Sequence, residues 1–433
     1  MIKSQQQILE KLGIARLNAM QIEAQNTISS TNEIVLLSPT GTGKTLAFLL
    51  PIIAALDPKS SEIQVLIVVP SRELALQIER VAREMGTGYK INAVYGGRAG
   101  SKDKVEIKHI PAILIGTPGR IADHLRRENI STEGIKTLVL DEFDKSLEIG
   151  FESDMSEIIN ALVDLQTKIL TSATKGVEIP AFVELSNPTE INYLGGATSS
   201  LKMKAILSPS KNKLPSLVQA ISHLSEQSGI VFCNLKETIQ DVSDALSKQG
   251  IGHGCFYGGM EQVDRERALI KFRNGTHQIL VATDLAARGI DVPELNFIIH
   301  YQIPVKSHEF THRNGRTARM HSDGTAYILK WEKEKMPDFI DEMDVEVLTD
   351  IQHRKASFWQ TIFLSGGRKD KISKGDIAGF MIKQGQLNKE DLGIIELKRD
   401  CAFVAISKSK AASLIQKTNN TRLKKKKVRV TMV

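Results

Sequence analysis

The sequence predicts an α/β protein with two parallel sheets in series and a small α+β domain after them. Three observations predict this fold. Short, continuous apolar runs alternate with helix-length amphipathic stretches, which is typical of strands buried on both faces of a parallel sheet. The alternation breaks near the middle of the chain, over residues 192–213, and then resumes. Residues 355–433 differ from the rest in charge and in the order of their elements.

Length and composition limit the possible classes of protein. A chain of 433 residues suggests two to four domains, and 41% apolar with 25% charged residues is ordinary for globular proteins. The longest apolar stretch, Leu46–Leu56, is shorter than the roughly 20 residues of a membrane-spanning helix. Three cysteines without a C-x-x-C pair exclude a disulfide scaffold and a thiolate zinc site. We therefore expect a cytoplasmic protein that does not bind membranes.

The expected strands define the first two domains. In the first domain, over 1–195, the apolar runs are 34–37, 65–69, 112–115, 137–140 and 168–170. A segment rich in Gly, Ser, Lys and Pro predicts a linker over 196–212. In the second domain, over 213–345, the runs are 229–233, 253–256, 278–281, 296–299 and 324–329. The two sets share no visible sequence repeat. A charged stretch from Trp331 to Lys355 is predicted to be a helical connector.

The motif with the clearest chemistry is Ser38-Pro-Thr-Gly-Thr-Gly-Lys-Thr45, between a predicted strand and an apolar helix. A strand, a glycine loop, and a Lys-Thr pair that opens a helix form a cradle for phosphates. Gly41 and Gly43 let backbone N–H groups face phosphate oxygens, and the helix N-terminus adds positive charge. Lys44 is expected to reach the β- and γ-phosphates, and the Thr45 hydroxyl to bind Mg²⁺.

A second motif, Asp141-Glu-Phe-Asp144, follows the predicted strand 137–140. An acid at the end of a buried strand beside a phosphate loop is where such enzymes bind Mg²⁺, so we expect Asp141 to bind the metal. Glu142 is the expected general base that orients the attacking water. A lone D-E-x-D would be weak evidence, but together with the phosphate loop it predicts ATP hydrolysis.

With these residues the chain resembles the DEAD-box RNA helicases along almost its whole length. Gln21 lies in a segment similar to the family's Q motif, whose glutamine reads adenine. Further motifs follow in the family's order: 70–75, 96–97, 117–120, 172–174, 262–265, 282–291 and 312–319. The resemblance implies two RecA-like domains that hydrolyse ATP between them and separate short RNA duplexes, with Ser172 and Thr174 coupling the two activities.

The resemblance also assigns roles to individual residues. Arg316 and Arg319 of the second domain would contact ATP on the first, and guanidinium groups suit a phosphoryl group that gains negative charge. The expected ATP-binding residues are Gln21, Ser38, Thr40, Gly41, Thr42, Gly43, Lys44, Thr45, Asp291, Arg316 and Arg319. The expected RNA contacts in the two domains, made mostly to phosphate and hence tolerant of sequence, are Pro70, Arg72, Gly97, Arg98, Thr117, Pro118, Gly119, Arg120, Arg265 and Thr283.

Two departures from the family pattern concern ATP. Phe143 occupies the third place of the tetrad, where the family has alanine, so extra volume is needed around its ring. Ser4 occupies the place of an aromatic residue that stacks on adenine in the family. Both departures favour a second hypothesis, a nucleotide-gated RNA clamp with little ATP turnover. A DNA translocase built on the same two domains is a third, which the Q motif argues against.

The C-terminal region, 355–433, is strongly basic, with 18 Lys+Arg against 6 Asp+Glu, whereas the rest of the chain has a net charge of −5. This asymmetry favours a nucleic-acid partner. Its strands and helices are predicted in the order β-α-β-β-α-β, which suggests an RRM-like domain. Residues 366–377 and 392–397 resemble the RNA-binding domain of DbpA-type bacterial DEAD-box proteins. That resemblance implies a 23S ribosomal RNA hairpin as the target.

Within this domain, Phe363 and Phe403 are the only aromatic residues in predicted strands, and either could belong to the core. We therefore expect RNA to contact loops and lysines, chiefly Arg368, Lys369 and Lys371. Lys424–Lys427 is either a solvated run or a phosphate contact. The sequence as a whole predicts a monomeric ATP- and Mg²⁺-dependent RNA helicase that acts in ribosome assembly.

Overall fold

The computed structural model describes residues 3–97, 100–174, 176, 178–195, 201–225, 227–284, 292, 295–317, 324–349 and 356–433. These residues form two compact units, one from the described residues up to 195 and the other from those after 200. Three predicted site residues, Arg98, Asp291 and Arg319, lie outside the described residues. No helix among the described residues is both long and apolar enough to cross a bilayer.

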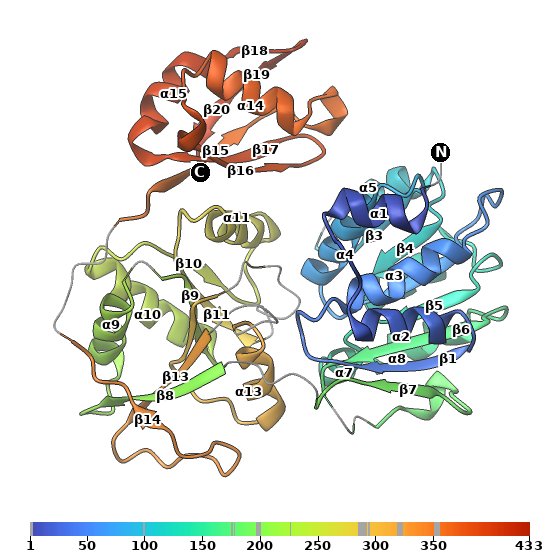
Figure 1. The fold of residues 1–433 in the computed structure, drawn as a ribbon, viewed down its shortest axis with the longest axis horizontal. Coiled ribbons are helices and arrows are strands. Elements are labelled where there is room, and N and C mark those ends of the chain that lie inside the picture. The colour runs from blue at the N-terminus through green and yellow to red at the C-terminus, as the bar shows by residue number, and fades with distance from the viewer. Residues whose placement is uncertain are drawn as a thin grey trace. The chain divides into compact units, whose positions relative to one another are not determined.

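The first unit is built on a seven-stranded parallel sheet with the order β3-β4-β2-β5-β6-β1-β7 (Figure 1). All five expected strands form, and β3 and β7 add to them. The bounds are β1 Glu33–Leu37, β2 Val65–Val68, β3 Ile91–Val94, β4 Ile113–Gly116, β5 Thr137–Leu140, β6 Thr167–Ser172 and β7 Thr189–Asn192.

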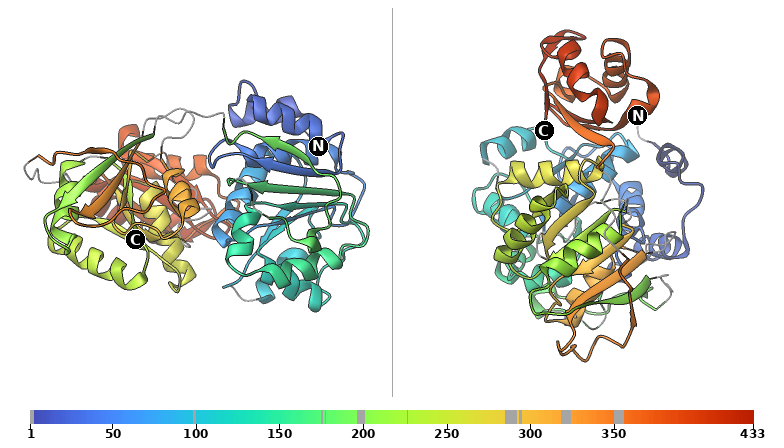
Figure 2. Two further views of the ribbon diagram at one scale, coloured as in Figure 1. Left: turned by 90° about the horizontal axis from the view of Figure 1, so that it is seen from below. Right: turned by 90° about the vertical axis from the view of Figure 1, so that its left-hand side faces the viewer.

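Helices cover both faces of this sheet, as the left view of Figure 2 shows. Alternate residues of β1 enter different cores: Ile34 and Leu36 pack with α1 to α4, and Val35 and Leu37 pack with the helices of the other face. Burial on both faces explains why the strands read as continuous apolar runs. The helices are α1 Gln5–Leu12, α2 Ala19–Ile28, α3 Lys44–Ala55, α4 Arg72–Met85, α5 Gly100–Ile107, α6 Pro118–Arg126, α7 Phe143–Glu148 and α8 Glu152–Asn160.

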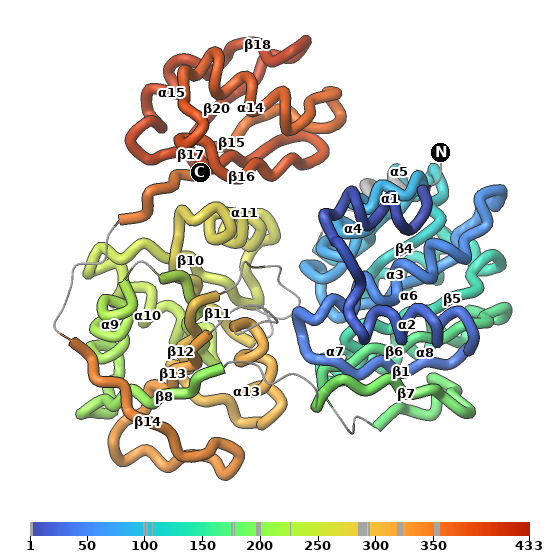
Figure 3. The backbone as a smooth tube through the Cα atoms, in the orientation of Figure 1, coloured from blue at the N-terminus to red at the C-terminus, as the bar shows by residue number. Residues whose placement is uncertain are grey.

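The second unit contains another seven-stranded parallel sheet, with the order β10-β11-β9-β12-β13-β8-β14. Numbered from its own first strand, this order is the same as that of the first sheet. The path of the chain can be followed in Figure 3. The strands are β8 Leu201–Ser208, β9 Gly229–Cys233, β10 His253–Phe256, β11 Ile279–Thr283, β12 Phe297–His300, β13 Gly324–Trp331 and β14 Asp344–Val345.

Two expectations about connections differ from the structure. The segment 196–212, expected to be a linker, includes β8, which pairs with β13 over eight residues as part of the second sheet. Its Lys and Ser residues concealed the strand because β8 is only partly buried along its first half. The predicted helix from Trp331 is wrong, since the described residues 332–349 contain the strand β14 and no helix. The helices of this domain are α9 Leu214–His223, α10 Lys236–Lys248, α11 Gln262–Arg273 and α13 Ser307–Asn314.

The C-terminal domain has the predicted β-α-β-β-α-β order and an additional hairpin. Its antiparallel sheet has the order β16-β17-β15-β20, and both helices lie on one side of it (Figure 1). The hairpin β18–β19 takes up part of the predicted closing strand. The elements are β15 Trp359–Leu364, α14 Lys374–Lys383, β16 Leu392–Leu397, β17 Ala402–Ser407, α15 Ala411–Thr418, β18 Thr421–Leu423, β19 Lys426–Val428 and β20 Val430–Met432.

Within the second unit, the outer face of the C-terminal sheet packs against the end of α11. Arg273 makes a two-pronged ion pair with Glu396, with Nε–Oε1 at 2.7 Å and Nη2–Oε2 at 2.8 Å, and both side chains are largely buried. The hydroxyls of Thr276 and Thr361 are 2.7 Å apart, and the Lys398 ammonium lies 2.7 Å from Glu266. A guanidinium fork on a carboxylate fixes orientation as well as distance.

Candidate ATP site and RNA-binding surfaces

The phosphate loop joins β1 to α3 in the first unit. Gly41 and Gly43 have φ of 84° and 89°, a backbone conformation that residues with a Cβ rarely adopt. Lys44 is 8% exposed, and its ammonium donates to the carbonyl of Ser38 and, at 3.3 Å, to that of Pro39. The loop therefore forms a lysine-bearing cradle at the N-terminus of α3. No side chain caps α3 at Gly43, and a helix N-terminus of this kind favours a bound anion.

Gln21 is attached to this loop. Its side-chain amide donates to the Gly43 carbonyl at 3.3 Å, and its oxygen accepts from the Asn18 backbone N–H at 3.0 Å. Asn18 in turn donates from its side chain to the Thr42 carbonyl at 3.1 Å. These contacts connect the segment expected to read adenine to the segment expected to bind phosphate. Ser4, which occupies the place of the family's adenine-stacking aromatic residue, caps the N-terminus of α1.

Asp141 lies at the end of β5 and is 3% exposed. Its carboxylate accepts hydrogen bonds from the Thr171 hydroxyl and from the Glu142 backbone N–H. Burial raises the pKa of Asp141, while the Thr171 hydrogen bond and the charge of Lys44 lower it. A buried carboxylate with a cation nearby fits Mg²⁺, since such ions bind through one or two carboxylates together with nucleotide phosphates. Among the described residues, no three His, Cys, Asp or Glu side chains form a cluster that could hold a metal ion by themselves.

The rest of the tetrad connects the ATP site to β6. The Thr174 hydroxyl donates to Asp144 Oδ2 at 2.8 Å, and Ser172 accepts from the Thr174 backbone N–H at 3.0 Å. Phe143 is 2% exposed and belongs to the apolar core on one face of the sheet. The volume that its ring needs is therefore supplied by the core, while Asp144 keeps its bond to Thr174. Glu142 has φ of 49° at the start of α7, a strained backbone at an expected catalytic residue.

In the second unit, the arginine segment is anchored by a residue that the sequence analysis did not select. Arg313 is 1% exposed, and its guanidinium pairs with Asp284 and donates to the Gln302 carbonyl at 2.6 Å and to Asn234 at 2.7 Å. This ties the motif that contains Thr283 to the motif that contains Arg316. Arg316 is 6% exposed within the same segment. Only the position of Arg313 within the motif 312–319 could have indicated this role.

In the first unit, several residues that are expected to contact RNA lie at the starts of α4 and α6. Arg72 begins α4 and lies against Gly97, where a Cβ would collide with its guanidinium. Arg120, near the start of α6, lies in the same way against Gly100. Pro118 opens α6, with Thr117 before it as the N-cap. The guanidinium groups of Arg72 and Arg120 thus pass close to the backbone at Gly97 and Gly100.

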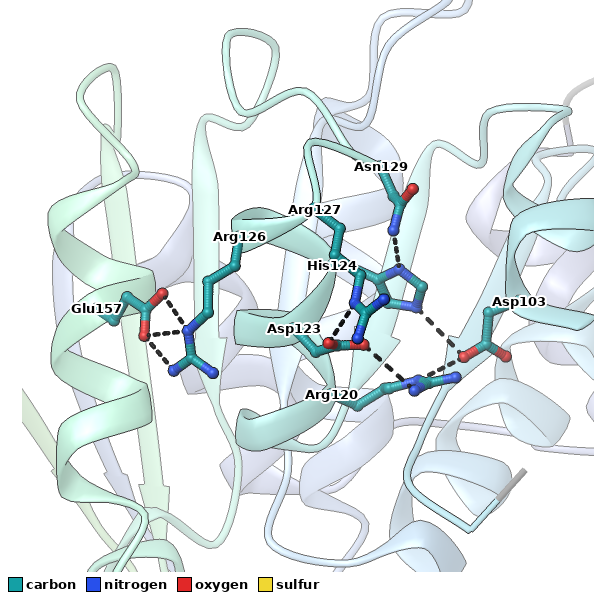
Figure 4. A network of polar contacts seen from close by, with 8 residues as sticks. All are labelled: Asp103, Arg120, Asp123, His124, Arg126, Arg127, Asn129 and Glu157. Atoms are coloured by element: carbon teal, nitrogen blue, oxygen red, sulfur yellow. Dashed lines mark hydrogen bonds and ion pairs between the residues drawn. The ribbon is translucent and has the colours of Figure 1, made fainter. Parts of the chain in front are cut away.

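Arg120 is held by a buried polar network (Figure 4). Its Nε donates to Asp103 Oδ2 at 2.7 Å and its Nη1 to Asp123 at 3.3 Å. His124 lies 3.2 Å from the same Asp103 oxygen, and Asn129 lies 3.2 Å from the other ring nitrogen of His124. The Asp103 side chain has no exposed surface. The sequence offered no signal for Asp103, which lies in α5, 17 residues before Arg120.

In the C-terminal domain, the residues of the predicted RNA-binding loop are exposed. Arg368 and Lys369 form a short 3₁₀ turn, and Lys371 follows it with φ of 58°. Within the run Lys424–Lys427, Lys424 pairs with Asp376 and Lys426 pairs with Asp370. Lys425 and Lys427 are exposed. The ion pair with Lys424 lowers the pKa of Asp376 to about 2.

Comparison with known proteins agrees with this arrangement. Residues 18–180 match the DEAD/DEAH box helicase family, 212–321 the helicase conserved C-terminal domain, and 361–432 the DbpA RNA binding domain. The chain is 29% identical to ATP-dependent RNA helicase DbpA of Bacillus subtilis, over 98% of this chain and 96% of that protein. It is 32% identical to ATP-dependent rRNA helicase rrp3 of Emericella nidulans, over 79% of this chain and 73% of that protein.

A solved structure of the DEAD-box helicase Mss116 bound to ssRNA is 26% identical, with a TM-score of 0.67, over 75% of this chain and 72% of that one. The chain therefore belongs to the DEAD-box family of ATP-dependent RNA helicases. It carries a DbpA-type RNA-binding domain as its third domain. The expected RecA-like and RRM-like folds and the class of enzyme, an RNA-dependent ATPase, are confirmed.

Proposed function

We propose that this protein uses ATP hydrolysis to separate short duplexes of ribosomal RNA during ribosome assembly in the cytoplasm, acting as a monomer. The observation that carries the proposal is the combination, in one chain, of a complete phosphate-loop site and a basic DbpA-type domain. One relative is named an rRNA helicase and two are named DbpA. The third domain would bring the catalytic domains to structured RNA within 23S ribosomal RNA.

The chemistry proposed for the ATP site follows from the first unit. Lys44 and the N-terminus of α3 would hold the β- and γ-phosphates, and Thr45 and Asp141 would hold Mg²⁺, which neutralises charge on the phosphates. Glu142 would take a proton from the attacking water. Arg316 and Arg319, with Asp291, would complete the site from the second domain.

RNA would be held mainly through its backbone. In support of this, Arg72 and Arg120 of the first unit lie close to Gly97 and Gly100. In the second unit, the Arg265 guanidinium lies 4.9 Å from the centre of the Phe256 ring. Contacts of guanidinium groups with phosphate position a strand without reading its sequence. Target choice would then come from the C-terminal domain, through Arg368, Lys369 and Lys371.

The first experiment is to measure phosphate release from ATP without RNA, with poly-U, and with a 23S ribosomal RNA fragment. Strong stimulation by the fragment at low concentration, with weak stimulation by poly-U, is expected. Glu142→Gln should lower phosphate release by about 10²–10⁴-fold, while Glu152→Gln, an exposed glutamate at the start of α8, should not. Full activity of Glu142→Gln would refute its role as base, and equal stimulation by both RNAs would refute ribosomal specificity.

The charge of the predicted loop can be tested separately. Lys369→Glu with Lys371→Glu should weaken binding to the 23S fragment and leave phosphate release without RNA unchanged, because the loop lies outside the ATP site. The matched control is Lys408→Glu with Lys410→Glu, two exposed lysines elsewhere in the domain. Equal weakening on poly-U would mean that the loop does not select the target.

The alternative, a nucleotide-gated clamp, predicts RNA binding with ATP analogues and no phosphate release. The burial of Phe143 removes one of the two reasons for that alternative, because the ring packs in the core without displacing Asp144. The other reason remains, since no aromatic side chain stands at Ser4. A protein that hydrolyses no ATP with any RNA would favour the clamp.

A further inference from the structure

Thr171 is a fully buried polar residue on a strand in the middle of the first sheet. It lies on β6, between β5 and β1, and has no exposed surface. A buried hydroxyl is costly unless it is hydrogen-bonded, so its partners indicate what it does. None of the roles proposed above for ATP, Mg²⁺ or RNA contacts involves Thr171, although it directly precedes the motif 172–174.

The register of the sheet places Thr171 beside the acidic tetrad. The strands β5 and β6 are parallel neighbours, and their last paired residues immediately precede Asp141 and Thr171. Val139 and Ile169, two residues earlier on each strand, pack in the same apolar core as α3. Because side chains alternate along a strand, Asp141 and Thr171 emerge on the face of the sheet that α3 covers. This is the helix that follows the phosphate loop.

The Thr171 hydroxyl connects two neighbouring residues of the tetrad. It donates to Asp141 Oδ1 and accepts from the Glu142 backbone N–H at 3.2 Å. The same N–H lies 3.1 Å from Asp141 Oδ1. One hydroxyl, one carboxylate oxygen and one backbone N–H therefore form a closed triangle, in which each group contacts the other two. Both hydrogen bonds to the carboxylate end on Oδ1, so the triangle uses only one of its two oxygens.

The triangle also stabilises an unusual backbone conformation at Glu142. This residue has φ of 49° and ψ of 47°, in the left-handed region that residues with a Cβ seldom adopt. Such a conformation costs free energy and persists only where the surrounding contacts impose it. The hydrogen bonds from the Glu142 N–H to Thr171 and Asp141 are contacts of that kind. They fix the turn at which the chain passes from β5 into α7.

We propose that Thr171 is a positioning residue of the ATP site, whose hydroxyl holds the Asp141 carboxylate and the Glu142 backbone in one fixed arrangement. The inference rests on the proposed function, since it takes Asp141 as a Mg²⁺ ligand and Glu142 as the base. Thr171 acts through these two residues and does not touch the nucleotide. Hydrogen-bond donors to a metal-binding carboxylate orient it, and their loss typically lowers metal affinity or activity by about 10- to 100-fold.

The test measures binding of a fluorescent, non-hydrolysable ATP analogue to the full-length protein while Mg²⁺ is titrated. Thr171→Val keeps the shape of the side chain without its hydroxyl. It should raise the half-saturating Mg²⁺ concentration by about 10- to 100-fold, while binding of the analogue in EDTA stays the same. Thr171→Ser keeps the hydroxyl and should restore the value of the parent. Thr87→Val is the matched control and should change neither result, since Thr87 is also buried in the first unit and its hydroxyl accepts from the Tyr89 backbone N–H at 3.3 Å.

Asp141→Asn separates this inference from the proposed metal site on which it rests. If Asp141→Asn needs no more Mg²⁺ than the parent, the metal site is wrong and the role of Thr171 fails with it. If Asp141→Asn needs more Mg²⁺ but Thr171→Val does not, only the role of Thr171 is wrong. In the double variant, Thr171→Val should cause no further loss, because the two residues act as one unit.

A role of Thr171 in packing alone predicts the opposite pattern, in which valine is tolerated and serine is not, and this result would also overturn the proposal. So would an equal loss of analogue binding with and without Mg²⁺. If Thr171→Val does not fold, Thr171→Ala removes the same hydroxyl and is judged by the same outcomes.

Discussion

The two parallel sheets have the same strand order but carry different chemistry. After β1, the first strand of the first sheet, the chain forms a glycine loop and Lys44. After β8, which has the same place in the second sheet, it forms a segment without glycine that leads to Lys213. The Lys213 ammonium donates to the Leu329 carbonyl at 2.9 Å and to Glu334 at 3.3 Å. The same topology therefore carries a phosphate-loop motif in one sheet and a lysine with structural contacts in the other, because the loops differ.

The largest expected effect separates these two lysines. Lys44→Ala should lower RNA-stimulated phosphate release by about 10²–10³-fold, because it removes the cation expected at the transferred phosphate. Lys213→Met should leave turnover of the folded protein unchanged and lower the free energy of unfolding by about 1–3 kcal/mol, since it leaves two acceptors without a donor. Phosphate release and urea denaturation measure the two effects. A catalytic defect in Lys213→Met at full stability would contradict the comparison.

The next effect concerns the buried ion pair of Arg313 and Asp284 in the second unit. Arg313→Met should destabilise the second unit by about 3–5 kcal/mol, because Asp284 is left without its partner. Denaturant unfolding, followed by tryptophan emission, reports it, since Trp331 and Trp359 both lie in this unit. Asp284→Asn with Arg313→Met should recover part of the loss. If the single variant is as stable as the parent, the ion pair is not a structural anchor.

A smaller effect is expected when the hydrogen bond between Thr174 and Asp144 of the tetrad is removed. Thr174→Val keeps the shape of the side chain but removes the hydrogen bond to Asp144. We expect duplex separation to fall about tenfold, the effect of losing a bond to a charged group, with a smaller fall in phosphate release. Thr167→Val, at the start of β6 and away from the tetrad, is the control. Equal losses in both activities would mean that Thr174 supports hydrolysis itself and does not couple it to unwinding.

The smallest effect is a pH dependence confined to the second unit. Burial lowers the pKa of His300 to about 3, and that of His277 to about 4. Below the ordinary value of about 6.5, the unfolded chain binds protons that the folded unit does not, so its stability falls as pH decreases towards these values. Each histidine contributes a slope of roughly 1–2 kcal/mol per pH unit. His300→Gln should flatten this slope, and an unchanged slope would contradict the assignment.

Much of the fold could be read from local patterns. Five strands of each parallel sheet were predicted because burial on both faces leaves an unbroken apolar run of strand length. β8 was missed because its Lys and Ser residues look like a linker, and only its pairing with β13 makes it a strand. The connector after Trp331 was misread as helical, since charged residues are typical of exposed helices as well as of extended edges.

The sequence by itself determined the chemistry of the ATP site. Gly41, Gly43 and Lys44 are neighbours along the chain, as are the four residues of the tetrad among themselves, and short-range geometry places each motif at the end of a strand and the start of a helix. Only the tertiary structure decided which side chains support them: Asp103 under Arg120, Arg313 on Asp284, and the core around Phe143. It also decided that Phe363 and Phe403 face away from the helices of their own domain and line a cavity with residues of α11. Such contacts join residues far apart in sequence, and local patterns hold no information about which distant side chains packing will bring together.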